Sequence, residues 1–254
     1  MDPSVSPIAE RVLSVTNELV ARLGRETFSA PVSHVYNPLV YARKGFDRYI
    51  HRFGQSAKQV IFVGMNPGPF GMVQTGVPFG DVQMVMSWMG IQVPVAQPEN
   101  SHPKRPVQGF SCARKEVSGR RLWGWAKERF GTPESFFSHF LVVNYCPLAF
   151  MEESGRNRTP DKLPLKERNR LFAICDHTLF ETIATYRPRW AIGIGGFAEK
   201  RIQKIMKGLN VSVGRITHPS PANPFANRGW IPRIESELAA MGIEIPKTHN
   251  SMTR

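Results

Sequence analysis

Three polar side chains of this 254-residue chain stand where predicted β-strands end. Asn66, Asn144 and His218 each lie at the end of a short run of β-branched and aromatic residues, or one or two positions beyond it. Ligands of parallel α/β sheets bind outside the carboxyl ends of the strands, so we expect these groups to converge at one edge of a sheet. Amides donate and accept hydrogen bonds, and an imidazole can donate to developing negative charge. The sequence therefore predicts a polar binding or catalytic site at this edge.

The glycine-rich segments near these residues do not fit the common phosphate or metal motifs. The loop that begins at Gly64 lacks the Gly-Lys-Ser/Thr ending of a P-loop. The run Gly193-Ile194-Gly195-Gly196 resembles half of a dinucleotide fingerprint, a pattern that more often marks close packing of a helix on a strand. No histidine has helical ligand spacing to another, and the H-x-E with P-C-x-x-C pattern of zinc deaminases is absent. We therefore expect neither a metal nor an organic cofactor.

The elements that must position these groups follow from the hydrophobic pattern. The pattern predicts strands over residues 59–64, 140–144, 189–194 and 211–217, and helices over residues 6–24, 81–90, 118–130, 164–186, 197–208 and 230–241. Strands that alternate with helices imply a parallel sheet covered on both faces. We therefore expect an α/β fold of three αβα layers with a short, mainly parallel, four-stranded central sheet.

The domain organisation is predicted to be simple. The proline-rich stretch 91–117 is typical of a long ordered surface excursion. The sequence shows no repeat and no linker, so we expect one domain over residues 1–254 that begins with the helix over about 6–24 and ends in a disordered tail after about 246.

The charge balance favours an anionic partner. The chain has 33 Lys and Arg against 20 Asp and Glu, a formal charge of +13, and nucleic acid is the usual partner of such a chain. Lys200, Arg201, Lys204 and Lys207 mark one side of a predicted helix and could neutralise phosphates. Three cysteines without a C-x-x-C pair fit a reducing compartment. No signal peptide or membrane span is recognised, so we expect an intracellular monomer without a membrane partner.

Several ordered motifs carry a resemblance to a known family. The chain resembles the single-strand-selective monofunctional uracil-DNA glycosylases, a branch of the uracil-DNA glycosylase superfamily, from about residue 31 to residue 242. The motifs that carry it are Gly64-Met65-Asn66-Pro67-Gly68-Pro69, Val77-Pro78-Phe79-Gly80, Asn144-Tyr145-Cys146-Pro147-Leu148 and His218-Pro219-Ser220-Pro221. Such enzymes flip a nucleotide out of the DNA stack and enclose its base.

The resemblance implies two catalytic residues. Asn66 is expected to position the water that attacks C1′, and an amide suffices there if the glycosidic bond breaks largely before the attack. His218 is expected to donate to uracil O2 as negative charge develops on it. The sequence leaves open whether His218 acts in its neutral or its protonated form. The motifs contain no lysine, so no amine is expected to attack C1′ and cleave the strand.

The resemblance also implies a base-binding pocket. Phe79 is expected to stack on the flipped base. Asn144 is expected to read uracil, because its oxygen can accept from N3–H while its NH₂ group donates to O4, and cytosine presents the opposite pattern. Gly68 and Met72 are expected to line the C5 side of the base with backbone N–H groups and a displaceable water, and Met65 to contribute backbone.

A proline-rich segment is expected to wedge into duplex DNA behind the flipped nucleotide. Members of the family carry Arg where this chain has Ala222 and a polar residue where it has Phe225, so Phe225 could act as an apolar plug. The segment consists of Pro219, Ser220, Pro221, Ala222, Asn223, Pro224, Phe225, Ala226, Asn227 and Arg228.

The resemblance therefore implies that this chain is a DNA repair glycosylase that needs no metal or cofactor. It would remove uracil and oxidised C5 derivatives such as 5-hydroxymethyluracil from single- and double-stranded DNA and leave an abasic site. Two alternatives stay open at this point. One is a glycosylase of the same superfamily that prefers deaminated purines such as xanthine or hypoxanthine, and the other is a non-catalytic protein that binds single strands or abasic sites.

Overall fold

The computed structural model describes residues 5–246 of the chain. The predicted tail after about residue 246 lies outside the described residues. The first helix, α1 (Pro7–Leu23), begins where the Ser6 hydroxyl accepts a hydrogen bond from the Ala9 N–H, with Pro7 at the first helical position. Within the described part, no helix is long and apolar enough to cross a membrane.

The central sheet has four parallel strands, as predicted, and their order is β3-β2-β6-β7. These strands are β2 (Val60–Gly64), β3 (Phe140–Asn144), β6 (Trp190–Ile194) and β7 (Ser212–Ile216). Every residue of β2 is buried, because β2 lies inside the sheet with helices over both faces. The residue pair Gly64 and Asn144 ends the β2–β3 ladder, so the loops that follow both strands start side by side.

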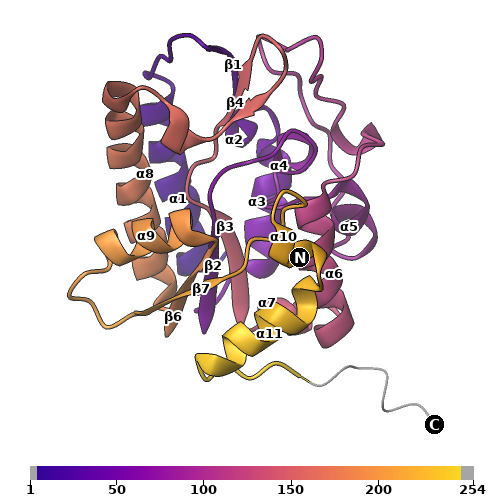
Figure 1. Ribbon diagram of the computed structural model, residues 1–254, viewed down its shortest axis with the longest axis vertical. Helices are drawn as coiled ribbons and strands as arrows, with labels where there is room; N and C mark the ends of the chain where they lie inside the picture. Colours follow the sequence, from indigo (N-terminus) through magenta and orange to yellow (C-terminus); the bar gives the residue numbers. More distant parts are fainter. Residues whose placement is uncertain (1–4, 247–254) are drawn as a thin grey trace.

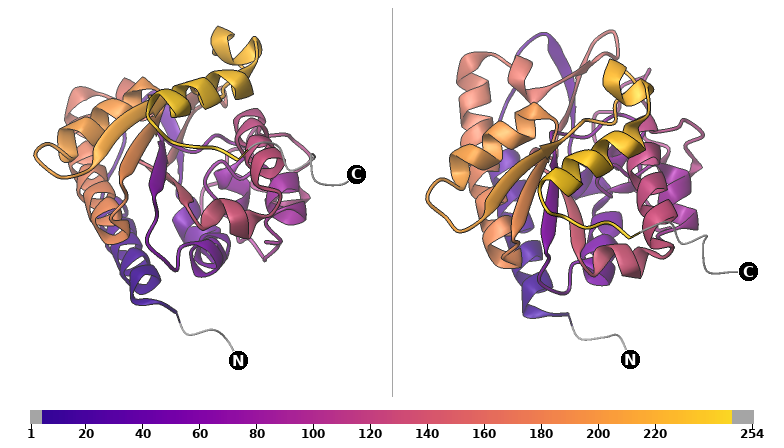
Figure 2. Two further views of the ribbon diagram at one scale, coloured as in Figure 1. Left: turned by 90° about the horizontal axis from the view of Figure 1, so that it is seen from below. Right: turned by 60° about the horizontal axis from the view of Figure 1, so that its bottom comes forward.

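Helices cover both faces of this sheet, which gives the predicted three-layer αβα architecture (Figure 1). One layer contains α1, α8 (Leu165–Tyr186) and α9 (Gly196–Ile205), and α9 packs directly on β6 and β7. The helices on the other side are α5 (Val82–Ser87), α6 (Val117–Phe130), α7 (Pro133–Phe137) and α11 (Trp230–Ala240). Figure 2 shows α11 lying across the β7 end of the sheet, where it contacts both β7 and α6.

The edge strand β3 is protected by α3 (Arg43–Phe53). The Tyr49 hydroxyl donates to the Val142 carbonyl at 2.9 Å and accepts from the Val142 N–H at 3.2 Å. One side chain therefore satisfies both backbone groups of Val142 on the outer edge of β3. The shorter helical segments are α2 (Pro38–Tyr41), α4 (Met72–Thr75), α10 (Pro224–Asn227) and the 3₁₀ turns Gly109–Ser111 and Pro160–Lys162.

A second, antiparallel sheet was not predicted from the sequence. It has the order β1-β4-β5 and consists of β1 (Val32–Tyr36), β4 (Ala149–Glu152) and β5 (Asn157–Arg158). Because β4 begins five residues after β3 ends, this sheet stands beyond the carboxyl end of the central sheet, at the top of Figure 1. Its strands are too short to show a clear alternation, and they form only through pairing between distant segments.

Candidate active site

A cavity of about 610 Å³ opens beyond the carboxyl ends of β2, β3 and β7. It brings together all seven residues expected to act on the base or the water, namely Met65, Asn66, Gly68, Met72, Phe79, Asn144 and His218. Of the predicted wedge segment, Ser220 and Pro221 line the cavity, whereas Pro219 and residues 222–228 do not belong to its lining. The predicted convergence of the two amides and the imidazole is confirmed.

The floor of the cavity depends on the absence of a side chain at Gly64. A Cβ atom built there would lie 2.5 Å from Phe79 Cε2 and 2.6 Å from Asn144 Oδ1. The Tyr145 N–H donates to the Gly64 carbonyl, so the β3 end is fixed against β2 at this point. The ring of Phe79 and the amide of Asn144 therefore meet directly over the end of β2.

Phe79 is held in an unfavourable backbone conformation. Its φ is +53°, a left-handed value that is rare for a bulky residue. Its carbonyl accepts from Trp123 Nε1 at 2.9 Å, and a Cβ atom at Gly119 would lie 1.9 Å from that oxygen. The half-buried ring faces the cavity, 6.2 Å from the His218 ring between centroids. Strain of this kind persists where the surroundings enforce it, often at functional sites.

The two amide side chains are oriented by their nitrogen atoms. Asn66 Nδ2 donates to the Leu148 carbonyl at 3.1 Å, which leaves Oδ1 as the group that can accept from a ligand or water. Asn144 Nδ2 lies 3.2 Å from Met72 Sδ, a weak acceptor, with Oδ1 over Gly64. Each amide therefore presents a defined acceptor, and Asn144 keeps a donor that is only weakly engaged.

His218 is held as a neutral ring with a defined tautomer. Its Nδ1 accepts from the Ser220 N–H at 3.0 Å, so the proton of the neutral ring is on Nε2. Burial lowers the pKa of His218 from 6.5 to about 4, because the charged form of the ring loses solvation there. The open question of its protonation is therefore answered in favour of a neutral Nε2–H donor.

The loop after His218 is stabilised by side-chain hydrogen bonds. Asn223 caps α10 and donates from Nδ2 to the His218 carbonyl at 3.1 Å. Arg121 of α6 donates to the Pro219 carbonyl and to Asn227 Oδ1, each at 2.9 Å. Phe225 is 54% exposed, and the Arg233 guanidinium lies 4.6 Å from its ring centroid. The aromatic side chain is therefore displayed at the surface and not used as a core anchor.

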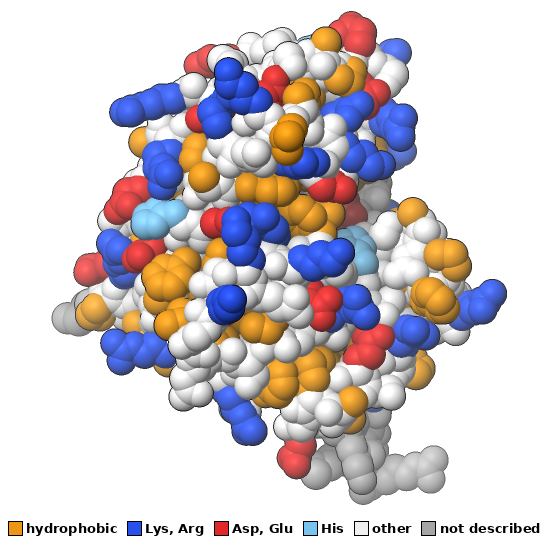
Figure 3. All heavy atoms as spheres, turned by 60° about the vertical axis from the view of Figure 1, so that its left-hand side comes forward, with side chains coloured by type: hydrophobic (Ala, Val, Ile, Leu, Met, Phe, Trp, Pro, Cys, Tyr) orange, Lys and Arg blue, Asp and Glu red, His pale blue; other side chains and the backbone are white. Residues whose placement is uncertain are grey.

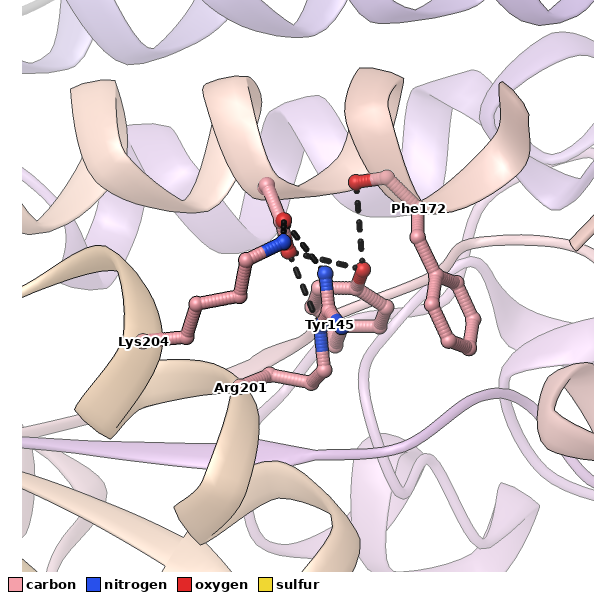
Figure 4. Close-up of polar contacts among 5 residues, drawn as sticks. Tyr145, Phe172, Arg201 and Lys204 are labelled. Carbon is pink, nitrogen blue, oxygen red and sulfur yellow. Dashed lines mark hydrogen bonds and ion pairs between the residues drawn. The ribbon is translucent and has the colours of Figure 1, made fainter. Parts of the chain in front are cut away.

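A polar network braces the residue after Asn144 (Figure 4). The Tyr145 hydroxyl donates to Asp176 Oδ1 at 2.9 Å, and the Arg201 guanidinium binds both oxygens of Asp176. Lys204 Nζ lies 3.3 Å from Asp176 Oδ2. The network ties the end of β3 to α8 and α9. Two members of the predicted basic helix face, Arg201 and Lys204, are thus paired with a partly buried carboxylate, and the Lys204 side chain stays 65% exposed.

Basic side chains do not form one continuous patch on the face drawn in Figure 3. Figure 3 shows Lys and Arg side chains spread over the side that carries α8 and α9, with acidic side chains between them. At the cavity itself, Arg114 and Lys115 belong to the lining. The Phe70 ring lies under the guanidinium groups of Arg114 and Arg105, at 4.5 and 5.7 Å from its centroid. The mouth of the cavity is therefore cationic and aromatic.

Several lining residues were missed by the sequence reasoning, namely Phe70, Arg114, Lys115, Glu116, Val117, Ser118, Asn157 and Thr159. Most of them lie in or next to the proline-rich stretch 91–117, which has no periodic pattern. The helix predicted from Ser118 begins at Val117, and Glu116 is its N-cap. Asn157 Oδ1 is buried without a hydrogen-bond partner among the described residues. In the described range, no three His, Cys, Asp or Glu side chains are placed to hold a metal ion.

Comparisons with known proteins agree on one superfamily. The family model described as the Uracil DNA glycosylase superfamily matches residues 51–235. A rat protein named single-strand selective monofunctional uracil-DNA glycosylase is 44% identical over 245 residues, 96% of this chain and 88% of its own length. Its bovine counterpart is 44% identical over 247 residues, 96% of this chain and 91% of its own length.

One solved structure supports the fold. The crystal structure of wild-type SMUG2 from Pedobacter heparinus superposes with a TM-score of 0.68 at 16% sequence identity. The match covers 92% of this chain and 97% of that protein.

Proposed function

The chain belongs to the single-strand-selective monofunctional family of the uracil-DNA glycosylase superfamily, and we propose that it hydrolyses the N-glycosidic bond of uracil in DNA and leaves an abasic site. The observation that carries this proposal is the cavity in which Asn66, Phe79, Asn144 and His218 converge. These residues come from segments spread over some 150 positions of the chain, roughly the length of a small domain. Their convergence supports a function that needs all four groups at once.

Recognition of the base is proposed to rest on Phe79 and Asn144. The flipped uracil stacks on the Phe79 ring, a contact worth about 1–3 kcal/mol per base that does not distinguish bases. Asn144 Oδ1 accepts from N3–H while Nδ2 turns from its weak sulfur partner to O4. Cytosine offers an acceptor at N3 and a donor at N4, so both contacts become repulsive unless the amide rotates.

Bond cleavage is proposed to depend on His218. As the bond between C1′ and N1 breaks, its electron pair stays on the uracil, and negative charge develops on O2. The His218 Nε2–H group donates to this oxygen. A neutral donor in a water-poor site stabilises the charge, because its dipole is oriented before the reaction by the Ser220 N–H bond to Nδ1.

Asn66 is proposed to place the attacking water. Its Nδ2 is held by the Leu148 carbonyl, so Oδ1 accepts one hydrogen of a water that then adds to the cationic C1′. The second proton of that water leaves to solvent. An amide is a weak base, which is sufficient when the sugar is already close to an oxocarbenium ion.

The finer specificity is part of the same proposal. Gly68, Met72 and the backbone at Met65 line the side of the pocket that would face C5, where a water could be displaced by a hydroxymethyl group. The enzyme is therefore proposed to act on 5-hydroxymethyluracil as well. The exposed Phe225 is proposed as the plug that fills the space left in duplex DNA, supported by Pro219 to Arg228 as the wedge segment.

A panel of oligonucleotides tests the proposal. Strands that carry uracil, 5-hydroxymethyluracil, xanthine or hypoxanthine, single-stranded and in duplexes, are incubated with the protein in a chelator and then cleaved with alkali at abasic sites. We expect cleavage at the two pyrimidines and faster reaction of single strands. Preferential cleavage at the purines would favour the deaminated-purine alternative. Binding without cleavage at any lesion would indicate a DNA-binding protein.

A further inference from the structure

The cavity wall beyond Asn144 is formed by a loop and a carboxyl group. Asn144 Nδ2 contacts Met72 Sδ, and Gly71 precedes Met72. A Cβ atom on Gly71 would lie 2.9 Å from Glu116 Cγ, and one on Gly68 would lie 2.8 Å from Glu116 Oε2. The wall therefore runs from Asn144 through Met72 to Glu116, which belongs to the cavity lining.

The order of atoms around a uracil ring indicates which atom of the base would face this wall. If O2 faces His218 and both N3 and O4 face Asn144, as the proposed function requires, the next ring position is C5. The residues that follow Asn144 along the wall are then the neighbours of any group attached to C5. Glu116 supplies the side-chain carboxyl group there.

Glu116 is more than a helix cap. Its Oε1 accepts from the Ser118 N–H at 3.3 Å, and its backbone N–H donates to Asp81 Oδ2 at 3.1 Å. Glutamate is not among the preferred N-cap residues, which are the shorter Ser, Thr, Asp and Asn. The extra length of the side chain brings Oε2 against Gly68 at the cavity. Burial raises the pKa of Glu116, and the neighbouring Asp81 adds to this effect.

We propose that Glu116 determines specificity at C5, because its carboxylate accepts a hydrogen bond from a 5-hydroxymethyl group and repels an anionic substituent such as 5-carboxyl. Charge-assisted hydrogen bonds are about twice as strong as neutral ones, so a hydroxyl donor gains from the carboxylate. Two carboxylates that share one site cannot both ionise without a large cost. The inference rests on the proposed function of the cavity and names the group that selects among its substrates.

The test compares substrate ratios in one enzyme preparation at pH 8, on the alkaline side of the ordinary pKa of a glutamate. Single strands that carry uracil, 5-hydroxymethyluracil or 5-carboxyuracil are cleaved under single-turnover conditions. Glu116→Gln keeps the side-chain length and an oxygen for Ser118. We expect it to raise the 5-carboxyuracil to uracil ratio by about tenfold or more. We expect it to lower the 5-hydroxymethyluracil to uracil ratio by about three- to tenfold.

Asp81→Asn is the matched control. Asp81 caps α5 and lies beside Glu116, but it does not line the cavity. Its substitution removes one negative charge nearby and keeps a good capping residue. We expect both ratios to stay within about twofold of the wild type, because Asp81 does not line the cavity and so makes no direct contact with a group on C5.

The outcomes separate this inference from the proposed function. Ratios that change in opposite directions in Glu116→Gln alone support it. The inference about Glu116 is overturned if the two ratios change in the same direction or do not change. It is also overturned if they change equally in Asp81→Asn. If the glutamine variant fails to fold, Glu116→Asp provides the same test, since it keeps the charge and the cap but withdraws the carboxylate from the wall. A wild type that releases no uracil overturns the proposed function as well.

Discussion

The neutral state of His218 leads to a quantitative prediction for the pH dependence of base release. With its pKa lowered from 6.5 to about 4, the ring is about 99% neutral at pH 6, whereas an ordinary histidine would be about one quarter neutral there. We expect the single-turnover rate of uracil release to show no inflection near pH 6.5 that depends on this residue. Protonation would also break the hydrogen bond from the Ser220 N–H to Nδ1.

The same pKa shift makes a prediction for stability. Between pH 6.5 and about 4, the unfolded chain binds a proton at His218 and the folded chain does not. Above pH 6.5 this residue therefore does not lower the free energy of unfolding. As the pH falls from 6.5 towards about 4, the free energy of unfolding decreases. The loss at pH 5 is at most about 2 kcal/mol, since part of the ring is exposed to solvent.

Two measurements with one variant test this reasoning. Urea unfolding of the wild type and of His218→Asn, at pH 7.5 and pH 5, should show a larger pH-dependent loss in the wild type. The single-turnover rate of His218→Asn should be lower by about 10²–10³, the usual effect of losing such a donor. A wild-type rate that changes with a midpoint near 6.5, together with equal pH dependence of stability in both proteins, would refute the neutral assignment.

Three further substitutions test other parts of the site. Asn66→Ala should lower single-turnover uracil release by about 100-fold or more, because the positioned water is lost. The Kd for a uracil-bearing strand, measured by fluorescence anisotropy, should stay within about threefold of the wild type. Equal turnover would contradict the proposed role of Asn66. Tyr145→Phe removes the donor to Asp176 and should lower the free energy of unfolding in urea by about 1 kcal/mol, and an unchanged midpoint would show that the network does not brace β3. Ala222→Arg should raise the rate on duplex relative to single strands, since the exposed loop would gain a side chain for the opened duplex; a constant ratio would count against the wedge.

The central sheet was predictable from the sequence because its strands are buried on both faces. Residues 60–64 form a continuous apolar run that ends at Gly64, and no helix of that length could be proposed instead. The small sheet gave no such signal, because β5 has two residues and the five residues of β1 do not alternate between apolar and polar types. The helix α3 was also missed. It begins after Ala42, which makes no side-chain cap, and Gly45 in its first turn lowers local helix propensity while allowing contact with Thr75.

The site was predictable where motifs follow strands and not elsewhere. Asn66, Asn144 and His218 were placed together because parallel strands end at one edge. Glu116 and Arg114 reach the cavity from a proline-rich segment without periodicity, so only the tertiary structure brings them there. The tautomer of His218 depends on one backbone N–H two residues away, which residue types do not reveal. Local patterns therefore located the side chains that are proposed to react, and packing determined their surroundings.

The most direct test of this account identifies the molecule that the protein releases from DNA. A single strand that contains one uracil and several cytosines is incubated with the wild type in a chelator, and the low-mass fraction is analysed by mass spectrometry. We expect free uracil, no free cytosine, and a strand that stays intact until alkali is added. Release of neither base, or of both at similar rates, would contradict a pocket in which Asn144 selects the base and His218 supports its departure.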